Sequence, residues 1–209
     1  TVHNAIDRLI LERYVSLDDL GIYTLAFTIG NTLGVFLIAF NRAYQPNYYQ
    51  LMSSDRHDRH SQVVRTFKAW LFLVTVVAHG AIWIGQPFLR VFAGPRFAGA
   101  IGLFPWFIVS AVATGFYYFF ATPVLFHKKT ILMPAITGVS ALVNIGLNLV
   151  LIPTLGLAGA ALATLVSHFL MAILAFLIGR RFEQFAWPWL LVAFSIMSLI
   201  ISLVFSVEF

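Results

Sequence analysis

Two asparagine side chains stand in an otherwise apolar stretch and are the first candidates for a functional role. Asn144 and Asn148 lie four residues apart between Leu142 and His168. In a helix this spacing puts both amides on one face. Because a polar group inside a membrane needs a hydrogen-bond partner, that face must turn toward protein or water. The pair therefore predicts either hydrogen bonds between helices or the lining of a polar transport path.

Histidines supply the titratable groups of the apolar runs. His79 and His168 lie well inside them, and a histidine exchanges protons near neutral pH. We consider His79 a candidate for proton coupling, with a simple hydrogen bond to a neighbour as the alternative. His57 and His60 have a spacing that some metal sites use. Their loop is rich in charges of both signs, which favours a solvated surface, so we expect no bound metal and no cofactor.

Catalysis finds little support in the chain. A nucleophile and a base would have to converge at one depth in the membrane. Ser167 and His168 are neighbours, and neighbouring side chains on a helix point about 100° apart. We therefore expect a protein that is not an enzyme.

The chain as a whole is too apolar for a soluble globular protein. Of its 209 residues, 60% are hydrophobic and 10% are charged, against roughly 25% charged in soluble domains. A helix crosses a hydrocarbon core of ~30 Å with about 20 apolar residues. On this measure the chain divides into six spans, near residues 20–40, 69–88, 101–120, 131–152, 158–178 and 187–206.

These runs predict an all-α fold, a polytopic transmembrane helix bundle. They lack the alternation of a membrane strand and are about twice its length. Pro153 to Gly156 supply the turn between the fourth and fifth spans. Residues 1–14 keep helical spacing and read as the tail of an earlier helix, so we expect the chain to be a fragment of a longer protein. Ser16 followed by Asp19 is a cap that opens the next helix.

Small residues at helical spacing predict places where two helices pack closely. Gly30 and Gly34 form one such pair, and Gly159, Ala163 and Ser167 form a ridge at the same spacing. Such ridges are common in membrane proteins of every function. We therefore assign them to packing.

Lysine and arginine are unevenly divided between the two ends of the predicted bundle. Loops 41–68, 121–130 and 179–186 belong to the end that holds nine of them, and the positive-inside rule places this end in the cytoplasm, with both termini outside. The nine are Arg42, Arg56, Arg59, Arg65, Lys68, Lys128, Lys129, Arg180 and Arg181, against Arg8, Arg13, Arg90 and Arg96 at the other end. This bias accounts for the net charge of +5, so we expect membrane lipids and no nucleic acid as partners.

Three stretches of the chain resemble a known family. They are DRLILERYVSLDDLGIYTLAFTIGNTL, AFNRAYQPNYYQLM and LVNIGLNLVLIPTLGLAGAALATLVSH. They look like the C-terminal half of the polysaccharide-biosynthesis or oligosaccharide flippases, which belong to the multidrug/oligosaccharidyl-lipid/polysaccharide exporter superfamily. The last stretch is the most specific, and the resemblance extends to about Arg181.

The resemblance implies an architecture and a substrate. Members of the family have two pseudo-equivalent helix bundles around a central cavity, and are thought to move undecaprenyl-diphosphate-linked sugars outward by alternating access. This chain would be one bundle in the inner (plasma) membrane, completed by a missing N-terminal half or by a second copy. The Asp-Arg pair of the first stretch, Asp7 and Arg8, and the pair Asn144 and Asn148 become candidate substrate contacts.

A diphosphate substrate also draws attention to Arg42, at the cytoplasmic end of the first predicted span. Its guanidinium can hold a phosphate with two parallel hydrogen bonds. Asn41 beside it and Gln45 three residues on would add amide donors if the helix continues to Pro46. The alternative is that Arg42 only anchors the span, as the positive-inside rule predicts.

Two other functions stay open. A drug/cation antiporter of the same superfamily should carry acidic residues inside its helices, and the six complete spans contain none. A membrane scaffold of a glycan assembly complex would need close helix packing but no cavity. Polar residues turned entirely against neighbouring helices would favour the scaffold.

Overall fold

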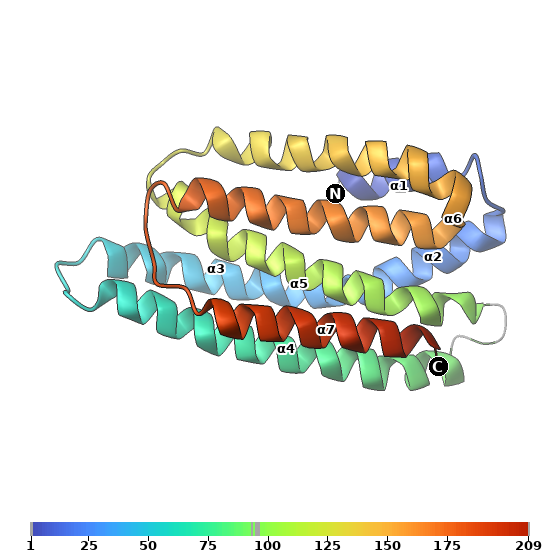
Figure 1. The fold of residues 1–209 in the computed structure, drawn as a ribbon, viewed down its shortest axis with the longest axis horizontal. Coiled ribbons are helices and arrows are strands. Elements are labelled where there is room, and N and C mark those ends of the chain that lie inside the picture. Colours follow the sequence, from blue (N-terminus) through green and yellow to red (C-terminus); the bar gives the residue numbers. More distant parts are fainter. Residues whose placement is uncertain (1, 93, 95–96, 209) are drawn as a thin grey trace.

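The computed structural model of this chain describes residues 2–92, 94 and 97–208, and the side chains of 7–92, 94 and 97–206 (Figure 1). Over these residues the chain forms helices and no strand, which confirms the predicted all-α bundle. The helices are α1 Val2–Leu11, α2 Leu17–Gly30, α3 Thr32–Met52, α4 Arg59–Phe92, α5 Gly99–Phe126, α6 Leu132–Gly179 and α7 Trp189–Glu208.

The predicted span 20–40 covers parts of α2 and α3, which meet at Asn31, and each of the other five spans lies within or nearly within one helix. Within the described ranges, five helical runs are long and apolar enough to cross a membrane, counting α2 with α3 as one run and α6 once. The run formed by α2 and α3 covers 36 residues, or about 54 Å at 1.5 Å per residue. Because the hydrocarbon core is only ~30 Å thick, an end of this run must reach the lipid headgroups.

The start of α2 follows from its cap. The Asp19 amide donates to the Ser16 hydroxyl oxygen at 3.1 Å, and the Ser16 hydroxyl donates to the Asp19 carboxylate at 2.7 Å. Asp18 and Asp19 in the first turn also favour the positive end of the helix dipole. The cap predicted from the sequence is therefore confirmed.

A reversal at Gly156 divides α6 into two limbs, 132–155 and 157–179. Its φ of 57° and ψ of −129° belong to a region that glycine adopts readily and other residues avoid. The two limbs consequently fold back along each other as a hairpin (Figure 1). Helix continues through Pro153, so the turn is sharper than the predicted stretch from Pro153 to Gly156.

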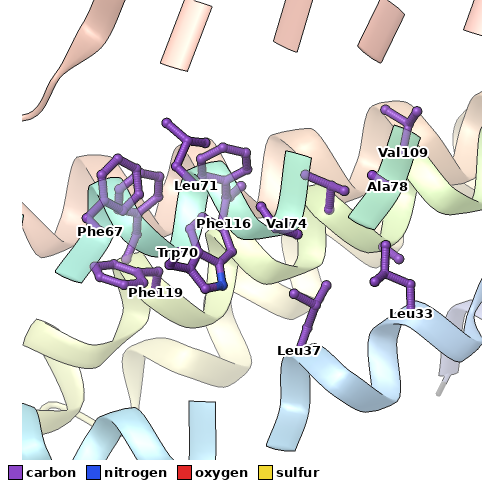
Figure 2. Packing of buried hydrophobic residues seen from close by; sticks show 14 of the residues in the cluster. Leu33, Leu37, Phe67, Trp70, Leu71, Val74, Ala78, Val109, Phe116 and Phe119 are labelled. Carbon is purple, nitrogen blue, oxygen red and sulfur yellow. The ribbon is translucent and has the colours of Figure 1, made fainter. Parts of the chain in front are cut away.

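The core forms around α5, which packs against α2, α3, α4, α6 and α7. Aromatic residues of α5 meet those of α4: Trp70 lies edge-on to Phe116 with ring centroids 5.1 Å apart, and Phe67 lies 4.9 Å from Phe119. Leu33 and Leu37 of α3 pack on the same cluster (Figure 2). The outer faces of α4 and α7 expose apolar side chains, as surfaces in contact with lipid do.

Small residues set the closest approaches between helices. A Cβ on Gly30 would lie 2.5 Å from Cβ of Phe107, so this glycine packs against α5. For Gly34 the nearest atoms belong to Asn31, one turn earlier. Of the predicted pair, Gly30 therefore makes an interhelical contact, whereas the atoms nearest to Gly34 lie beside its own helix.

The segments 53–58, 127–131 and 180–188 lie at one end of the bundle (left in Figure 1). Glu183 links the segments 180–188 and 127–131 to the first turn of α4, since its carboxylate oxygens lie 3.0 Å from Nε2 of His127 and 3.1 Å from Nε2 of His60. Arg56 pairs with Asp58 in the first of these segments, and the Arg56 hydrogen bond holds the pKa of the Asp58 carboxyl below its usual range. The structure thus brings these basic segments together at one end of the bundle (Figure 1), as the count of lysine and arginine in the loops predicts. Arg96 lies outside the described residues.

A topology experiment tests which side of the membrane this end occupies. The chain has no cysteine, so single cysteines at the exposed positions Ser53 and Thr154 give clean signals. We expect Ser53→Cys to be protected from an impermeant thiol reagent in intact cells and Thr154→Cys to be labelled, because basic loops are retained in the cytoplasm. Lysed cells provide the control, in which both positions react. Labelling of Ser53→Cys alone in intact cells would reverse the orientation.

Candidate functional site

A buried carboxyl group lies among α1, α2 and both limbs of α6. Asp7 of α1 is fully buried. The Tyr23 hydroxyl donates to its Oδ2 at 3.1 Å and the Thr164 hydroxyl to the same oxygen at 3.0 Å. The Asn148 amide nitrogen donates to Oδ1 at 2.6 Å. These donors come from α2, the second limb of α6 and the first limb, so Asp7 joins three separate helical segments to α1.

Further polar side chains extend the network along the hairpin. The Asn148 amide also donates to Oδ1 of Asn144 at 3.2 Å, and the Asn144 amide reaches the Ser167 hydroxyl at 3.5 Å. Ser140 donates across the hairpin to the Ser167 carbonyl at 2.6 Å. All of these side chains are buried. We refer to Asp7, Tyr23, Ser140, Asn144, Asn148, Thr164 and Ser167 as the Asp7 cluster.

The hairpin explains why these residues meet. Ser140, Asn144 and Asn148 follow each other at intervals of one turn on the first limb. Asn148 and Thr164 are equally far from Gly156 along the chain, so the reversal brings them opposite each other. Gly159 lies against the backbone of Leu151, which lets the limbs approach closely enough for direct hydrogen bonds.

The hydrogens of the Asp7 cluster allow Asp7 to hold or release a proton. The Thr164 hydroxyl has one hydrogen but lies 3.0 Å from both Oδ2 of Asp7 and the Ala160 carbonyl. With Asp7 ionised, that hydrogen goes to the carboxylate. With Asp7 protonated, the carboxyl donates to the Thr164 oxygen and the hydroxyl hydrogen goes to Ala160. In both protonation states the carboxyl group of Asp7 and the hydroxyl of Thr164 have hydrogen-bond partners, and no helix has to move.

The Asp7 cluster also offers oxygen atoms to a small cation. Oδ1 of Asn148 is buried and has no hydrogen-bond partner among the described residues. Carboxylate, amide and hydroxyl oxygens are the ligands that hard cations prefer. Within the parts of the chain that the structure describes, no three His, Asp or Glu side chains are grouped to hold a metal ion. A site built here would therefore use one carboxylate and neutral oxygens.

The structure places the residues singled out from the sequence in different regions. Asp7, Asn144 and Asn148 meet in the Asp7 cluster, whereas Arg8 is exposed on the outer side of α1. Asn41, Arg42 and Gln45 lie on α3, which continues through Pro46 to Met52 as the expected grip requires. Arg42 is exposed, Gln45 is half-buried, and the buried Oδ1 of Asn41 has no partner among the described residues.

His79 occupies a different part of the bundle. Its Nδ1 lies 2.8 Å from the Thr75 carbonyl, and a carbonyl only accepts, so Nδ1 carries a hydrogen. It is half-buried on α4, which lies across the bundle from α1 (Figure 1). This contact is the simple hydrogen bond considered as its alternative role, and proton coupling at His79 stays a prediction.

Three members of the Asp7 cluster escaped the sequence reasoning: Tyr23, Ser140 and Thr164. For Thr164 a signal existed, since its distance from the glycine turn equals that of Asn148. Ser140 precedes Asn144 by one turn on the same face. Tyr23 offered none, because only the packing of α2 beside α1 brings its hydroxyl to Asp7.

Comparison with known proteins places most of the chain in a transport family. The family model described as MatE, part of an exporter superfamily, matches residues 1–150. The matched region contains Asp7, Asn144 and Asn148, whereas Thr164 lies beyond it. No curated protein and no solved structure matches the chain.

Proposed function

We propose, from the premise that this chain belongs to the MatE family of membrane exporters, that it forms part of a cation-coupled transporter of a lipid-linked oligosaccharide. Transport proceeds by alternating access, and no bond is made or broken. The observation that carries cation coupling is the Asp7 cluster, a fully buried carboxyl group inside an apolar bundle. Ionisable groups at such positions mark ion pathways more often than packing.

The coupling step follows from the positions of the partners. Asp7 holds α1 to α2 and to both limbs of α6 through single hydrogen bonds. Binding a proton or a small cation removes the net charge of the carboxylate and changes these bonds. Because a ligand shifts a conformational equilibrium only by its different affinities for two states, the cation then favours the state in which α1 and the α6 hairpin enclose it.

Support for the substrate comes from the flippase-like stretches and from α3. The uncharged part of the first span ends at Asn41, and Arg42 follows, so the exposed guanidinium lies where lipid headgroups begin. We propose that Arg42, with Asn41 and Gln45, contacts there the diphosphate that joins a sugar to its lipid carrier. A second bundle, from the same polypeptide or another copy, supplies the opposite wall of the path. The inner (plasma) membrane is the expected location.

A drug/cation antiporter of the same superfamily is the second candidate. The six complete spans lack acidic residues, which by itself disfavours such an antiporter. Asp7 lies on α1, outside those spans, and is nevertheless buried in the bundle. The Asp7 cluster therefore serves this candidate as well, and the substrate alone separates the two.

Transport by the purified protein in liposomes tests the proposal. One assay follows a fluorescent undecaprenyl-diphosphate oligosaccharide and the other follows ethidium, each under an imposed proton or sodium gradient. We expect glycolipid flipping that depends on one gradient and stops when an ionophore collapses it. Protein-free liposomes are the control. Ethidium transport without flipping would replace the proposal by the antiporter, and flipping indifferent to both gradients would remove cation coupling.

A further inference from the structure

An open groove of about 570 Å³ lies between the second half of α3 and the first turns of α4. The loop 53–58 closes one end. Its polar lining includes Tyr44, Asn47, Tyr48, Gln50, Gln62 and Thr66. The groove is separate from the Asp7 cluster, which lies on α1, α2 and α6.

The groove lies at the level of the lipid headgroups. On α3 its lining begins with Phe40, in the last residues of the uncharged run 20–41, and on α4 it stops at Thr66, before the uncharged run 69–89 begins. Arg42 and Lys68 mark this boundary, and both are exposed. A lipid in the adjoining leaflet therefore presents its headgroup, and not its acyl chains, to the groove.

Two buried hydroxyl groups belong to the rings that line the groove. Tyr44 is 6% exposed and Tyr48 is 1% exposed, and neither hydroxyl oxygen has a hydrogen-bond partner among the described residues. A buried polar atom without a partner lowers stability and calls for an explanation. Tyr44 stacks on Phe119 at 4.4 Å and Tyr48 lies edge-on to Phe126 at 5.8 Å. Phenylalanine at both positions would keep these ring contacts. The two hydroxyl groups therefore contribute only when a polar group of a ligand forms hydrogen bonds with them.

The lining indicates the chemistry of the guest. It combines aromatic rings with amide and hydroxyl groups, and its one charged residue, Arg56, is paired with Asp58 at 3.0 Å. A free phosphate would favour unpaired positive charge. A sugar ring offers hydroxyl donors and acceptors at its edge and an apolar face to an aromatic ring. We infer that the groove binds the sugar headgroup of a membrane glycolipid.

This headgroup has two possible sources. One is the transported oligosaccharide on its diphosphate carrier, waiting in the leaflet, and this source rests on the proposed function. The other is a resident glycolipid such as a glucosyl-diacylglycerol, which does not. Both sources present a sugar at the level of the lipid headgroups. Because binding is measured without any gradient, it is tested separately from transport.

Binding in nanodiscs, measured for three probes, tests the inference. The probes are an undecaprenyl-diphosphate-linked disaccharide, glucosyl-diacylglycerol and, as a lipid without sugar, phosphatidylglycerol. We expect the double variant Tyr44→Phe, Tyr48→Phe to weaken binding of a sugar probe by about tenfold while unfolding at the same or a higher temperature than wild type. Gln50 is an exposed lining residue, so Gln50→Ala should weaken binding of the sugar probe without disturbing the core. Tyr118→Phe on α5, outside the groove, is the matched control.

Each outcome has a defined meaning. Loss for the disaccharide probe alone assigns the groove to the transported substrate, and loss for glucosyl-diacylglycerol alone assigns it to a resident glycolipid. Unchanged sugar binding in both groove variants would overturn the inference. An equal loss of phosphatidylglycerol binding would overturn it too, because the groove would then not select for sugar. A lower unfolding temperature of the double variant without ligand would also overturn it, because the hydroxyls would then have a structural partner. Failure of flipping with intact sugar binding would contradict the proposed function alone.

Discussion

Asp7→Asn is expected to abolish gradient-driven transport in a protein that still folds. Asparagine keeps the size of the side chain. Its amide oxygen in the place of Oδ2 can accept from Tyr23 and Thr164, and its amide nitrogen then faces Asn148, whose amide can turn its oxygen toward it. It has no charge to neutralise and cannot take up a proton. A gradient of 100 mV acting on one charge supplies about 2.3 kcal/mol, or roughly 50-fold in accumulation. We expect that factor to disappear when substrate accumulation is measured with and without the gradient.

The control for Asp7→Asn is Glu12→Gln, which removes an exposed carboxylate just beyond the end of α1. It should transport like wild type, and both variants should reach the membrane in equal amounts. Gradient-driven accumulation by Asp7→Asn at the wild-type level would show that the Asp7 cluster is a packing feature. The scaffold considered from the sequence would then gain support, because the polar side chains of the hairpin would serve only to hold helices together.

Gly159→Ala is expected to destabilise the α6 hairpin severely. A Cβ at this position would collide with the carbonyl of Leu151 on the opposite limb, and a backbone group cannot rotate away as a side chain can. We expect a loss of about 1–3 kcal/mol and a lower unfolding temperature in detergent. Because the limbs must separate, Asn148 and Thr164 move apart and cation coupling should weaken as well.

Gly146→Ala is the matched control within the same hairpin. Nothing lies within 4 Å of a Cβ built there, so the substitution should be neutral or stabilise by about 0.5–1 kcal/mol, the usual helix preference for alanine over glycine. Equal unfolding temperatures for Gly159→Ala and wild type would show that the limbs are not held at the distance the structure gives.

The sequence did not predict which neighbouring helix each face of the first span would contact. The Gly30 and Gly34 spacing predicted one packing ridge, yet only Gly30 faces α5. The run changes from α2 to α3 at Asn31, and the Asn31 side chain lies in the space beside Gly34. A spacing rule assumes one continuous helix, so it does not anticipate such a change.

The sequence by itself determined the features that depend on local chain properties and on the bilayer. Apolar runs of bilayer length specify an all-α membrane bundle, Ser16 starts α2, Gly156 permits the reversal of α6, and a four-residue interval puts Asn144 and Asn148 on one face. Only the tertiary structure decided that this face meets Asp7. That contact joins α1 to a hairpin more than half the chain away, and it depends on how whole helices pack. Helix packing in lipid arises from shape and buried hydrogen bonds between distant segments. The spacing of residues along one helix defines a face, but it does not say which distant helix that face meets.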